Sequence, residues 1–344
     1  MSLYVDIEKQ LGDFHLQVKF HSDNRPLALL GASGCGKSLS LRCIAGILTP
    51  DRGRIVLNGE TLFDSEKKID LPPQKRHVGY LFQQYALFPN MTVRKNIAAA
   101  LPDKKGREAA VRELLRRFRL EEVAELKPSQ LSGGQQQRCA LARILASQPQ
   151  AILPDEPLSA LDSYLRYQLE LELKETLEDF PGPVLWVSHD RGEAYRNCET
   201  VCVLDQGRSQ PLTTLQELMA HPATEAAARL SGCKNFLDAL PRGEEVFLPQ
   251  WGLHLNCGRA VDPATRRVGL RAHCIHQDSR GFPCRVVRIV EDVFSTVVLL
   301  QPLSATEEAP LLRMEVDKDI STSWHQADTI SVAIAPEHIL LLTQ

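Results

Sequence analysis

The amino-acid sequence predicts an α/β core with a mainly parallel sheet, followed by a smaller all-β domain. Short apolar runs alternate with helical patterns from residue 1 to about residue 235. A glycine-rich loop, residues 31–36, stands between an apolar run and a helical pattern. Residues 236–344 instead hold short β-branched segments separated by Gly, Pro, Asp and Ser. A chain of 344 residues suits two domains, because one domain averages about 150 residues.

The elements of the core can be assigned in order along the chain. Apolar and polar positions alternate through residues 3–30 around two turn-like breaks and end in the buried run Leu27–Leu30. The helical segments of about residues 84–150 then interrupt the alternation, which predicts a helical insertion. Further strands are predicted at 54–57, 77–82, 151–153, 184–187 and 201–204, and helices in LSLRCIAGI, REAAVRELLRRFRL, 135–145 and 164–177.

Composition and charge exclude several classes of protein. Lys and Arg number 40 against 43 Asp and Glu, so the formal net charge of -3 leaves no basic excess for a nucleic-acid backbone. No run approaches the roughly 18 apolar residues of a spanning helix, and the start MSLYVDIEKQ lacks a secretion signal. The nine cysteines form no CxxC pair, which favours reduced thiols over a disulfide framework or a zinc site. We therefore expect a chain that binds no nucleic acid and is neither secreted nor membrane-spanning.

The loop GASGCGKS fills the pattern G-x-x-x-x-G-K-S between a strand and a helix. In this context backbone N–H groups and a helix N-terminus bind phosphates, Lys37 reaches the β- and γ-phosphates, and the Ser38 hydroxyl binds Mg²⁺. An ordinary glycine turn leaves the complete pattern unexplained. The loop alone predicts a bound nucleoside triphosphate, as in kinases, GTPases and motor ATPases. The residues expected to hold the nucleotide are Gly31, Ala32, Ser33, Gly34, Cys35, Gly36, Lys37, Ser38 and Leu39.

Two carboxylates follow the apolar run of residues 151–153 at the end of a second predicted strand. Asp155 is placed to hold Mg²⁺ through its water shell, and Glu156 is placed to polarise the water that attacks the γ-phosphate. An acidic pair after a strand is often only a solvated turn. The phosphate loop earlier in the chain favours the catalytic interpretation.

Further motifs surround this acidic pair in a fixed order. LSGGQQQR at residues 131–138 precedes it, and SALD at residues 159–162 follows it. VSHD carries His189, and GYLFQQYALFP carries Gln83. Across residues 1 to about 235 these motifs strongly resemble the ATP-binding cassette (ABC) family of P-loop NTPases. The resemblance implies ATP and Mg²⁺ as cofactors and ATPase activity.

The resemblance also implies a shared site. In this family two cassettes face each other, and the LSGGQ segment of one covers the phosphate loop of the other. The hydroxyl of Ser132 and the backbone of Gly133 and Gly134, at the start of a helix, would then donate to the γ-phosphate across the dimer. Gln135 completes this nucleotide-binding segment. One chain would thus carry two half-sites.

Four more residues receive roles from the same resemblance. Gln83 would sense Mg²⁺ and the attacking water, and His189 would contact the γ-phosphate. Asp162 would link the two subunits. Phe14 is the candidate that stacks on adenine, although it is equally suited to the core. His189, for its part, could instead be a satisfied structural histidine, but its position after an apolar strand favours the functional role.

Pro154 departs from the family pattern, which has an apolar residue at this position. A proline removes a backbone donor from what should be a central strand. If the missing N–H faces the sheet, we expect the strand to end one residue early and Asp155 to shift. Hydrolysis should persist, at a lower rate.

The remaining segments resemble parts of importer subunits. The apolar residues 85–89, directly after Gln83, match the region that receives a short helix from a membrane subunit in transporters, or they are subdomain core. VGLRAHCI, SVAIAPEHILLL and the strands between them resemble the TOBE/MOP-like accessory β domain of importers, most closely the molybdate and sulfate importers. In some of these the β domain binds the oxyanion. Ser295 and Thr296 are the candidates for that contact, unless they are ordinary strand surface.

The resemblance thus implies an importer ATPase that energises uptake of an oxyanion such as molybdate, sulfate or tungstate. The chain would work as a homodimer or paired cassette beneath two transmembrane permease subunits, served indirectly by an extracytoplasmic solute-binding protein. It would be cytoplasmic and peripheral on the inner face of the cell membrane. Ferric ion, sugar or polyamine import remains an alternative, as does a soluble ABC ATPase outside transport. A phosphotransferase would not need LSGGQ or SALD, and exporters often fuse the cassette to membrane helices.

Overall fold

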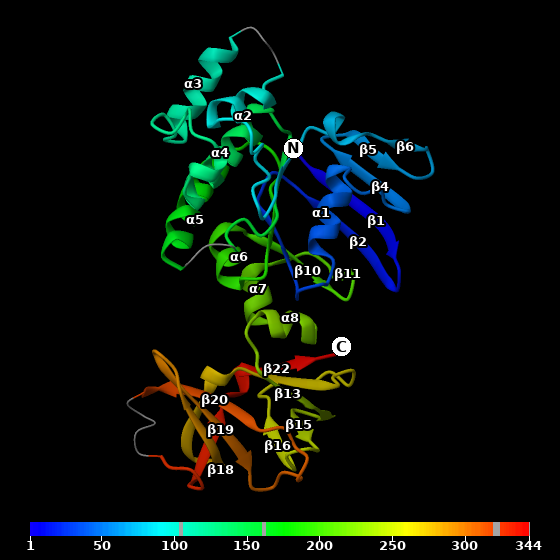
Figure 1. The fold of residues 1–344 in the computed structure, drawn as a ribbon. Coiled ribbons are helices and arrows are strands. Elements are labelled where there is room, and N and C mark those ends of the chain that lie inside the picture. The colour runs from blue at the N-terminus through cyan, green and yellow to red at the C-terminus, as the bar shows by residue number, and fades with distance from the viewer. Residues whose placement is uncertain (103–105, 160–162, 319–323, 344) are drawn as a thin grey trace. The chain divides into compact units, whose positions relative to one another are not determined.

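The computed structural model describes residues 1–344 except 103–105, 160–162, 319–323 and 344, and only the backbone of 163–165. The chain forms two compact units, Met1–Leu215 and Gln216–Gln344 (Figure 1). Each unit has its own hydrophobic core. The first unit carries every motif of the predicted nucleotide site.

The first unit is an α/β fold, as the sequence predicts. Its strands are β1 Leu3–Leu11, β2 Phe14–Ser22, β3 Leu27–Leu30, β4 Arg52–Leu57, β5 Glu60–Asp64, β6 Ile69–Asp70, β7 Val78–Leu81, β8 Ala151–Pro154, β9 Leu185–Ser188, β10 Thr200–Asp205, β11 Arg208–Ser209 and β12 Thr213–Thr214. Its helices are α1 Lys37–Ala45, α2 Val93–Ala100, α3 Arg107–Arg117, α4 Gly133–Ala146, α5 Ser163–Glu178 and α6 Arg191–Asn197. Two short 3-10 helices, η1 Pro73–Lys75 and η2 Pro128–Gln130, lie between them.

The sheet of this unit is mixed. Strand β3 lies between β10 and β9 and is parallel to both. Strands β7 and β8 are also parallel, and bridges at Ile152–Val184 and Asp155–Val187 join β8 to β9. The strands β1, β2, β4, β5 and β6 form an antiparallel layer that extends the sheet beyond β11. The parallel part brings the carboxyl ends of β3 and β8 to one edge, and the site residues follow these ends.

The helical insertion stands where the sequence predicts it, between β7 and β8. Its helices α2, α3 and α4 contact one another and lie away from the antiparallel strands (Figure 1). Helix α2 begins at a side-chain cap, because Thr92 accepts a hydrogen bond from the N–H of Lys95. Buried Asn96 ties the preceding loop to α2 through bonds to the backbone of Phe88 and Met91.

The second unit is an all-β fold preceded by two short helices, α7 Leu215–Ala220 and α8 Glu225–Leu230. Its sheets have the orders β13-β17-β22, β14-β15-β16 and β20-β19-β18-β21. Buried Trp251 lies in their common core. The strands are β13 Asn235–Asp238, β14 Leu240–Arg242, β15 Glu245–Leu248, β16 Leu253–Asn256, β17 Arg267–Leu270, β18 Ile275–Glu291, β19 Ser295–Pro302, β20 Leu312–Asp317, β21 Thr329–Ile334 and β22 Ile339–Leu342, with the 3-10 helices η3 Ala272–Cys274 and η4 Pro336–His338.

The boundary between the units differs from the predicted one. The sequence places it at residue 235 because the helical pattern continues to that point, whereas the compact units meet at Leu215 and Gln216. Helix α8 belongs with the β unit for a physical reason. Glu225 of α8 pairs with Arg267 of β17, and Ala228 of α8 packs in a small cluster with residues of β22. A helix signal in a sequence does not reveal which neighbour the helix packs against.

Two further expectations can be compared with the structure. All nine cysteines are free thiols, and eight of them are buried, as expected for small apolar core residues. In the part of the chain that the structure describes, no helix is both long and apolar enough to cross a lipid bilayer.

Candidate nucleotide site

The phosphate loop joins the end of β3 to the start of α1, as its sequence predicts. Gly34 and Gly36 have positive φ angles of 81° and 108°, the left-handed region that favours glycine. At Gly36 a side chain is also excluded by space, because an added Cβ would lie 2.6 Å from Leu16 Cδ1. The loop therefore wraps closely around the N-terminus of α1, whose first N–H groups have no side-chain cap.

Lys37 opens α1 and points back into this loop. Its side chain is buried, and Nζ donates hydrogen bonds to the carbonyl oxygens of Gly31 at 2.7 Å and Ala32 at 3.0 Å. The ammonium is thus already desolvated at the place where a phosphate would lie. A phosphate oxygen is a stronger partner for it than a neutral carbonyl, because the acceptor then carries a charge opposite to that of the ammonium.

The acidic residue Asp155 meets the phosphate loop directly. Its Oδ1 accepts a hydrogen bond of 2.7 Å from Ser38 Oγ, and its Oδ2 accepts one of 2.6 Å from the hydroxyl of Tyr80. Ser38 and Asp155 therefore bring two oxygen donors together, which is the kind of ligand Mg²⁺ prefers. Among the described residues no group of three or more His, Cys, Asp or Glu gathers at one point. A Mg²⁺ ion here would take its other ligands from water and the nucleotide.

Pro154 does not end the strand early. Strand β8 continues through Pro154, which pairs with Leu81 of β7. The prediction of an early strand end was wrong, because the missing donor points away from β7. The N–H of Asp155 donates to Leu81 at 2.9 Å, and that of Glu156 donates to Val187 of β9 at 3.0 Å, so alternate N–H groups face opposite neighbours. The proline removes one donor on the β9 side and leaves Asp155 bonded to the residues described above.

Glu156 follows β8 with a backbone conformation that is rare for a side-chain-bearing residue. Its φ angle is 46°, and a non-glycine residue in such a region costs on the order of 1–3 kcal/mol. The carboxylate Oε2 lies 3.2 Å from Nδ1 of His189, the residue after β9. The strained turn therefore places the Glu156 carboxylate beside His189, a contact that the sequence did not predict.

Gln83 reaches the same turn from the end of β7. Its Nε2 donates to Ser159 Oγ at 3.0 Å, and that hydroxyl donates to the backbone oxygen of Glu156 at 2.9 Å. The structure thus connects Gln83 to Glu156 through Ser159, a contact that the sequence did not predict. Asp162 lies outside the described residues.

The loop that carries His189 is fixed by a buried carboxylate. Glu193 accepts hydrogen bonds of 2.7 Å from Trp186 Nε1 and from Ser188 Oγ, and Ser188 Oγ in turn accepts from the N–H of Asp190. Burial raises the pKa of the Glu193 carboxyl above its usual range. His189 itself is exposed. No sequence pattern predicts this role for Glu193, because its contacts depend on its burial in the folded chain.

Phe14 lies where a nucleotide base could reach it. It stands at the start of β2 and lines an open cavity of about 370 Å³ that Asp205 and Arg208 of the neighbouring strands also line. Part of the cavity wall is the phosphate loop itself, through residues 32–35. Phe14 also packs against the core. The half-buried ring of Phe14 therefore packs on the core with one part and lines the cavity with another.

The LSGGQ segment, residues 131–135, forms the start of α4 and is called the signature segment below. Ser132 Oγ accepts from the N–H of Gln135 at 3.3 Å, and the Gln135 side chain accepts from the N–H of Ser132 at 2.9 Å. This reciprocal capping box begins a helix whose first residues are Gly133 and Gly134. Ser132 is exposed. In the described part of the chain no hydrogen bond joins this segment to the phosphate loop.

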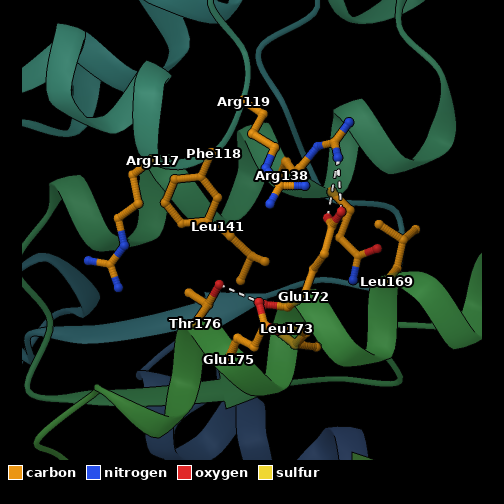
Figure 2. Close-up of a pocket in the computed structure, with 11 residues that line it drawn as sticks. Arg117, Phe118, Arg119, Arg138, Leu141, Leu169, Glu172, Leu173, Glu175 and Thr176 are labelled. Atoms are coloured by element: carbon orange, nitrogen blue, oxygen red, sulfur yellow. Dashed lines mark hydrogen bonds and ion pairs between the residues drawn. The ribbon is translucent and has the colours of Figure 1, made fainter.

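A small polar cavity lies between α3, α4 and α5, further along the signature helix (Figure 2). Its volume is about 70 Å³, room for a few water molecules. Gln137 is buried at its edge, and neither polar atom of its amide has a partner among the described residues. Figure 2 shows the ion pair of Arg138 with Glu172 beside it, at 3.2 Å. No sequence pattern predicts this cavity.

The predicted oxyanion contacts in the second unit are already engaged. Ser295 Oγ donates to the carboxylate of Glu315 at 2.9 Å, and Thr296 is fully buried. A carboxylate beside Ser295 repels an anion. These two hydroxyls therefore do not form an open anion site.

Comparison with known proteins agrees with this geometry. The profile of the family described as ABC transporter matches residues 15–159. The spermidine/putrescine import ATP-binding protein PotA of Nitratidesulfovibrio vulgaris is 32% identical over 357 residues, which cover 96% of this chain and 89% of that protein. The sulfate/thiosulfate import ATP-binding protein CysA of Synechocystis is 39% identical over 259 residues, which cover 72% of this chain and 69% of that protein.

A solved structure is similar as well. It is the dimeric, post-hydrolysis state of an ATP-binding cassette bound to ADP and Pi, with a TM-score of 0.52 and 28% sequence identity. The match covers 62% of this chain and 99% of that one. Fold, motifs and relatives agree, and the chain belongs to the ABC transporter family as an ATP-binding cassette ATPase.

Proposed function

We propose that this chain is the ATP-hydrolysing subunit of an importer and that it works as a dimer of facing cassettes. The observation that carries the proposal is the convergence of Lys37, Ser38, Asp155, Glu156 and His189 at the ends of β3, β8 and β9. The similar solved cassette is dimeric. The relatives named above are import ATP-binding proteins.

In this proposal each chain contributes two half-sites. The phosphate loop with Lys37 holds the triphosphate, and Ser38 and Asp155 hold Mg²⁺, which neutralises charge on the phosphates. The exposed Ser132 and the first N–H groups of α4, from the partner subunit, donate to the γ-phosphate. The capping box leaves the proton of the Ser132 hydroxyl free for this contact, because the oxygen acts there as an acceptor. Asp162 is assigned to the contact between the subunits, as the resemblance implies.

Glu156 is the proposed general base. Its carboxylate accepts a proton from the attacking water, and the oxygen of that water forms a bond to phosphorus while the bond to the leaving ADP oxygen breaks. His189 lies beside the carboxylate and is exposed toward the place of the γ-phosphate in this scheme. Gln83 is linked to the same turn through Ser159. In this proposal Gln83 senses Mg²⁺ and the attacking water. Phe14 is proposed to stack on the adenine ring of ATP.

The test of this mechanism is Glu156→Gln, which removes the base and keeps the shape of the side chain. Phosphate release should fall by about 10²- to 10⁴-fold, and an ATP-bound dimer should accumulate on size exclusion. Glu60→Gln, the same change at an exposed residue of β5, is the control. Unchanged phosphate release in Glu156→Gln would remove this residue from the role of base.

The segment of residues 85–89 supports a membrane partner. Arg143 of α4 donates to the backbone oxygens of Tyr85 and Ala86 and lies over the ring of Phe88, with 5.2 Å between guanidinium and ring centre. Tyr85 is buried, whereas Phe88 is 46% exposed. One part of the predicted patch is therefore core, and the other part is available to a helix from a permease subunit. We propose two such subunits, an extracytoplasmic solute-binding protein and a location at the inner face of the membrane.

For the solute we propose a polyamine in preference to an oxyanion. The relative that covers 96% of this chain is a spermidine/putrescine import protein, and a second such protein, from Lawsonia intracellularis, is 34% identical and covers 94% of it. The sulfate import protein covers 72%. The engaged Ser295 and Thr296 add support, because an oxyanion has no open hydroxyl pair there.

Uptake in cells that lack this chain tests the choice of solute. Complementation with the chain should restore import of labelled spermidine, and the Glu156→Gln variant should not. Restoration of sulfate or molybdate import, with spermidine unaffected, would favour the oxyanion instead. Transport of neither class would leave sugar or ferric-ion import as the next candidates.

A further inference from the structure

Tyr80 is a buried residue that contacts the proposed metal site and to which the sequence motifs assign no role. It lies on β7, where it pairs with Leu153 of β8 in parallel register. Successive side chains of a strand alternate between the two faces of the sheet. Asp155, two residues after Leu153, therefore projects from the same face as Tyr80. The 2.6 Å hydrogen bond between their side chains is a diagonal contact between neighbouring strands.

The two oxygens of Asp155 have donors of different kinds. Oδ1 accepts from Ser38, a half-exposed hydroxyl at the start of α1 that can rotate toward a metal. Oδ2 accepts from Tyr80, which is 8% exposed and whose ring centre lies 4.3 Å from that of Phe82. Packing therefore fixes the Tyr80 hydroxyl, whereas the Ser38 hydroxyl is free to exchange partners.

We propose that Tyr80 is a positioning residue of the Mg²⁺ site, which holds Oδ2 of Asp155 so that Oδ1 faces the metal position beside Ser38. This inference rests on the proposed roles of Ser38 and Asp155. Residues that hydrogen-bond a metal-binding carboxylate fix its orientation, and their loss typically weakens metal affinity or activity by about 10- to 100-fold. Without the phenol, Oδ2 of Asp155 loses this hydrogen bond. The carboxylate is then free to rotate and must be ordered when the metal binds.

Tyr80→Phe tests the proposal with a loss of one oxygen atom. Binding of a fluorescent ATP analogue is measured in EDTA and across a Mg²⁺ titration, on the full chain. The Mg²⁺ concentration that gives half of the maximal increase in analogue binding should rise by about tenfold. The affinity for the analogue in EDTA should stay unchanged. Tyr80→Met, which also lacks the hydroxyl, should give the same result if the phenylalanine variant proves unstable.

Tyr4→Phe is the matched control, because Tyr4 also donates to an aspartate, Asp6, at 3.1 Å on β1 outside the site. It should leave both titrations unchanged. Asp155→Asn distinguishes a failure of the proposed role of Tyr80 from a failure of the proposed metal site. If Asp155→Asn weakens the Mg²⁺ dependence and Tyr80→Phe does not, Tyr80 is only a core residue and this inference is wrong. If Asp155→Asn has no effect on the Mg²⁺ dependence, the proposed metal site itself is wrong.

Discussion

The phosphate loop and the signature segment both end at the N-terminus of a helix, but the two helix starts are prepared differently. Helix α1 begins after Gly36 in a left-handed conformation and has no side-chain cap, whereas α4 begins with the capping box of Ser132 and Gln135. Helix N-terminal N–H groups without side-chain partners are ready to bind an anion. In the proposed function α1 would bind the phosphates within its own chain, and the capped and exposed start of α4 would add to a nucleotide that another chain holds.

The residues around the two helices differ in the same way. Near α1 the structure brings together Lys37, Asp155 and Glu156, each with a defined hydrogen-bond partner. Near α4 the hydrogen bonds of the exposed Ser132 to described residues all lie within its own helix start. In the proposed function one half-site is therefore prearranged within the chain, and the other would depend on assembly. The following predictions test this difference.

Lys37→Met should give the largest effect, because it removes the buried cation of the prearranged half-site. The loss of one preorganised charged donor costs about 10²- to 10³-fold in rate, and ATP affinity should fall as well. Phosphate release and equilibrium binding of ATP measure the two effects. The exposed Lys67→Met is the control, and near wild-type rates in Lys37→Met would contradict the assignment of the phosphate loop.

Ser132→Ala should affect the assembly-dependent half-site alone. The rate should fall by about tenfold or more through loss of the hydroxyl donor, while ATP binding to the isolated chain stays unchanged. The same change removes a helix cap, which costs about 1 kcal/mol of stability. Thermal unfolding therefore accompanies the rate measurement, and a loss of monomer ATP affinity equal to the loss of rate would contradict the comparison.

Glu193→Gln should alter how stability depends on pH near the prearranged site. The pKa of Glu193 is raised in the folded chain, so its contribution to stability is complete below the usual value of 4.5 and decreases as pH rises through the folded-state pKa. The glutamine variant lacks this decrease. Urea unfolding of both proteins from pH 4.5 upward should show the variant gaining relative to wild type, and a constant difference would disprove the shift.

Pro154→Val should give the smallest effect. The valine N–H can donate toward β9, and this gain of about 1 kcal/mol is offset by the greater freedom of the unfolded chain. ATP hydrolysis should stay near the wild-type rate, because Asp155 already has both partners in the presence of the proline. A large rise in rate would show that Pro154 does slow the enzyme.

The outcomes show what the sequence can predict and what it cannot. The positions of the phosphate loop, the acidic pair and His189 follow from local patterns, because each is contiguous in sequence and its backbone is set by glycines or by a strand end. Tyr80, Ser159 and Glu193 could not be identified in this way. Their contacts depend on strand register and on which helix face is buried, and both are set by packing between distant segments.

The C-terminal unit shows a similar limit. Its β content follows from β-branched segments, but the start of the unit and the state of Ser295 do not. Helix α8 joins it through contacts with β17 and β22, and Ser295 is engaged by a glutamate of the adjacent strand β20. The sequence predicts composition-driven features well, whereas pairings between strands need the folded chain.

A mixture of two inactive variants tests the shared site most directly. Ser132→Arg disables the signature half, Lys37→Met disables the phosphate half, and phosphate release is measured for each variant and for an equimolar mixture. If random pairing places half of the chains in mixed dimers with one intact site of two, the mixture should recover about a quarter of the wild-type rate per chain. A mixture no faster than the average of its two components would contradict a site shared between two chains.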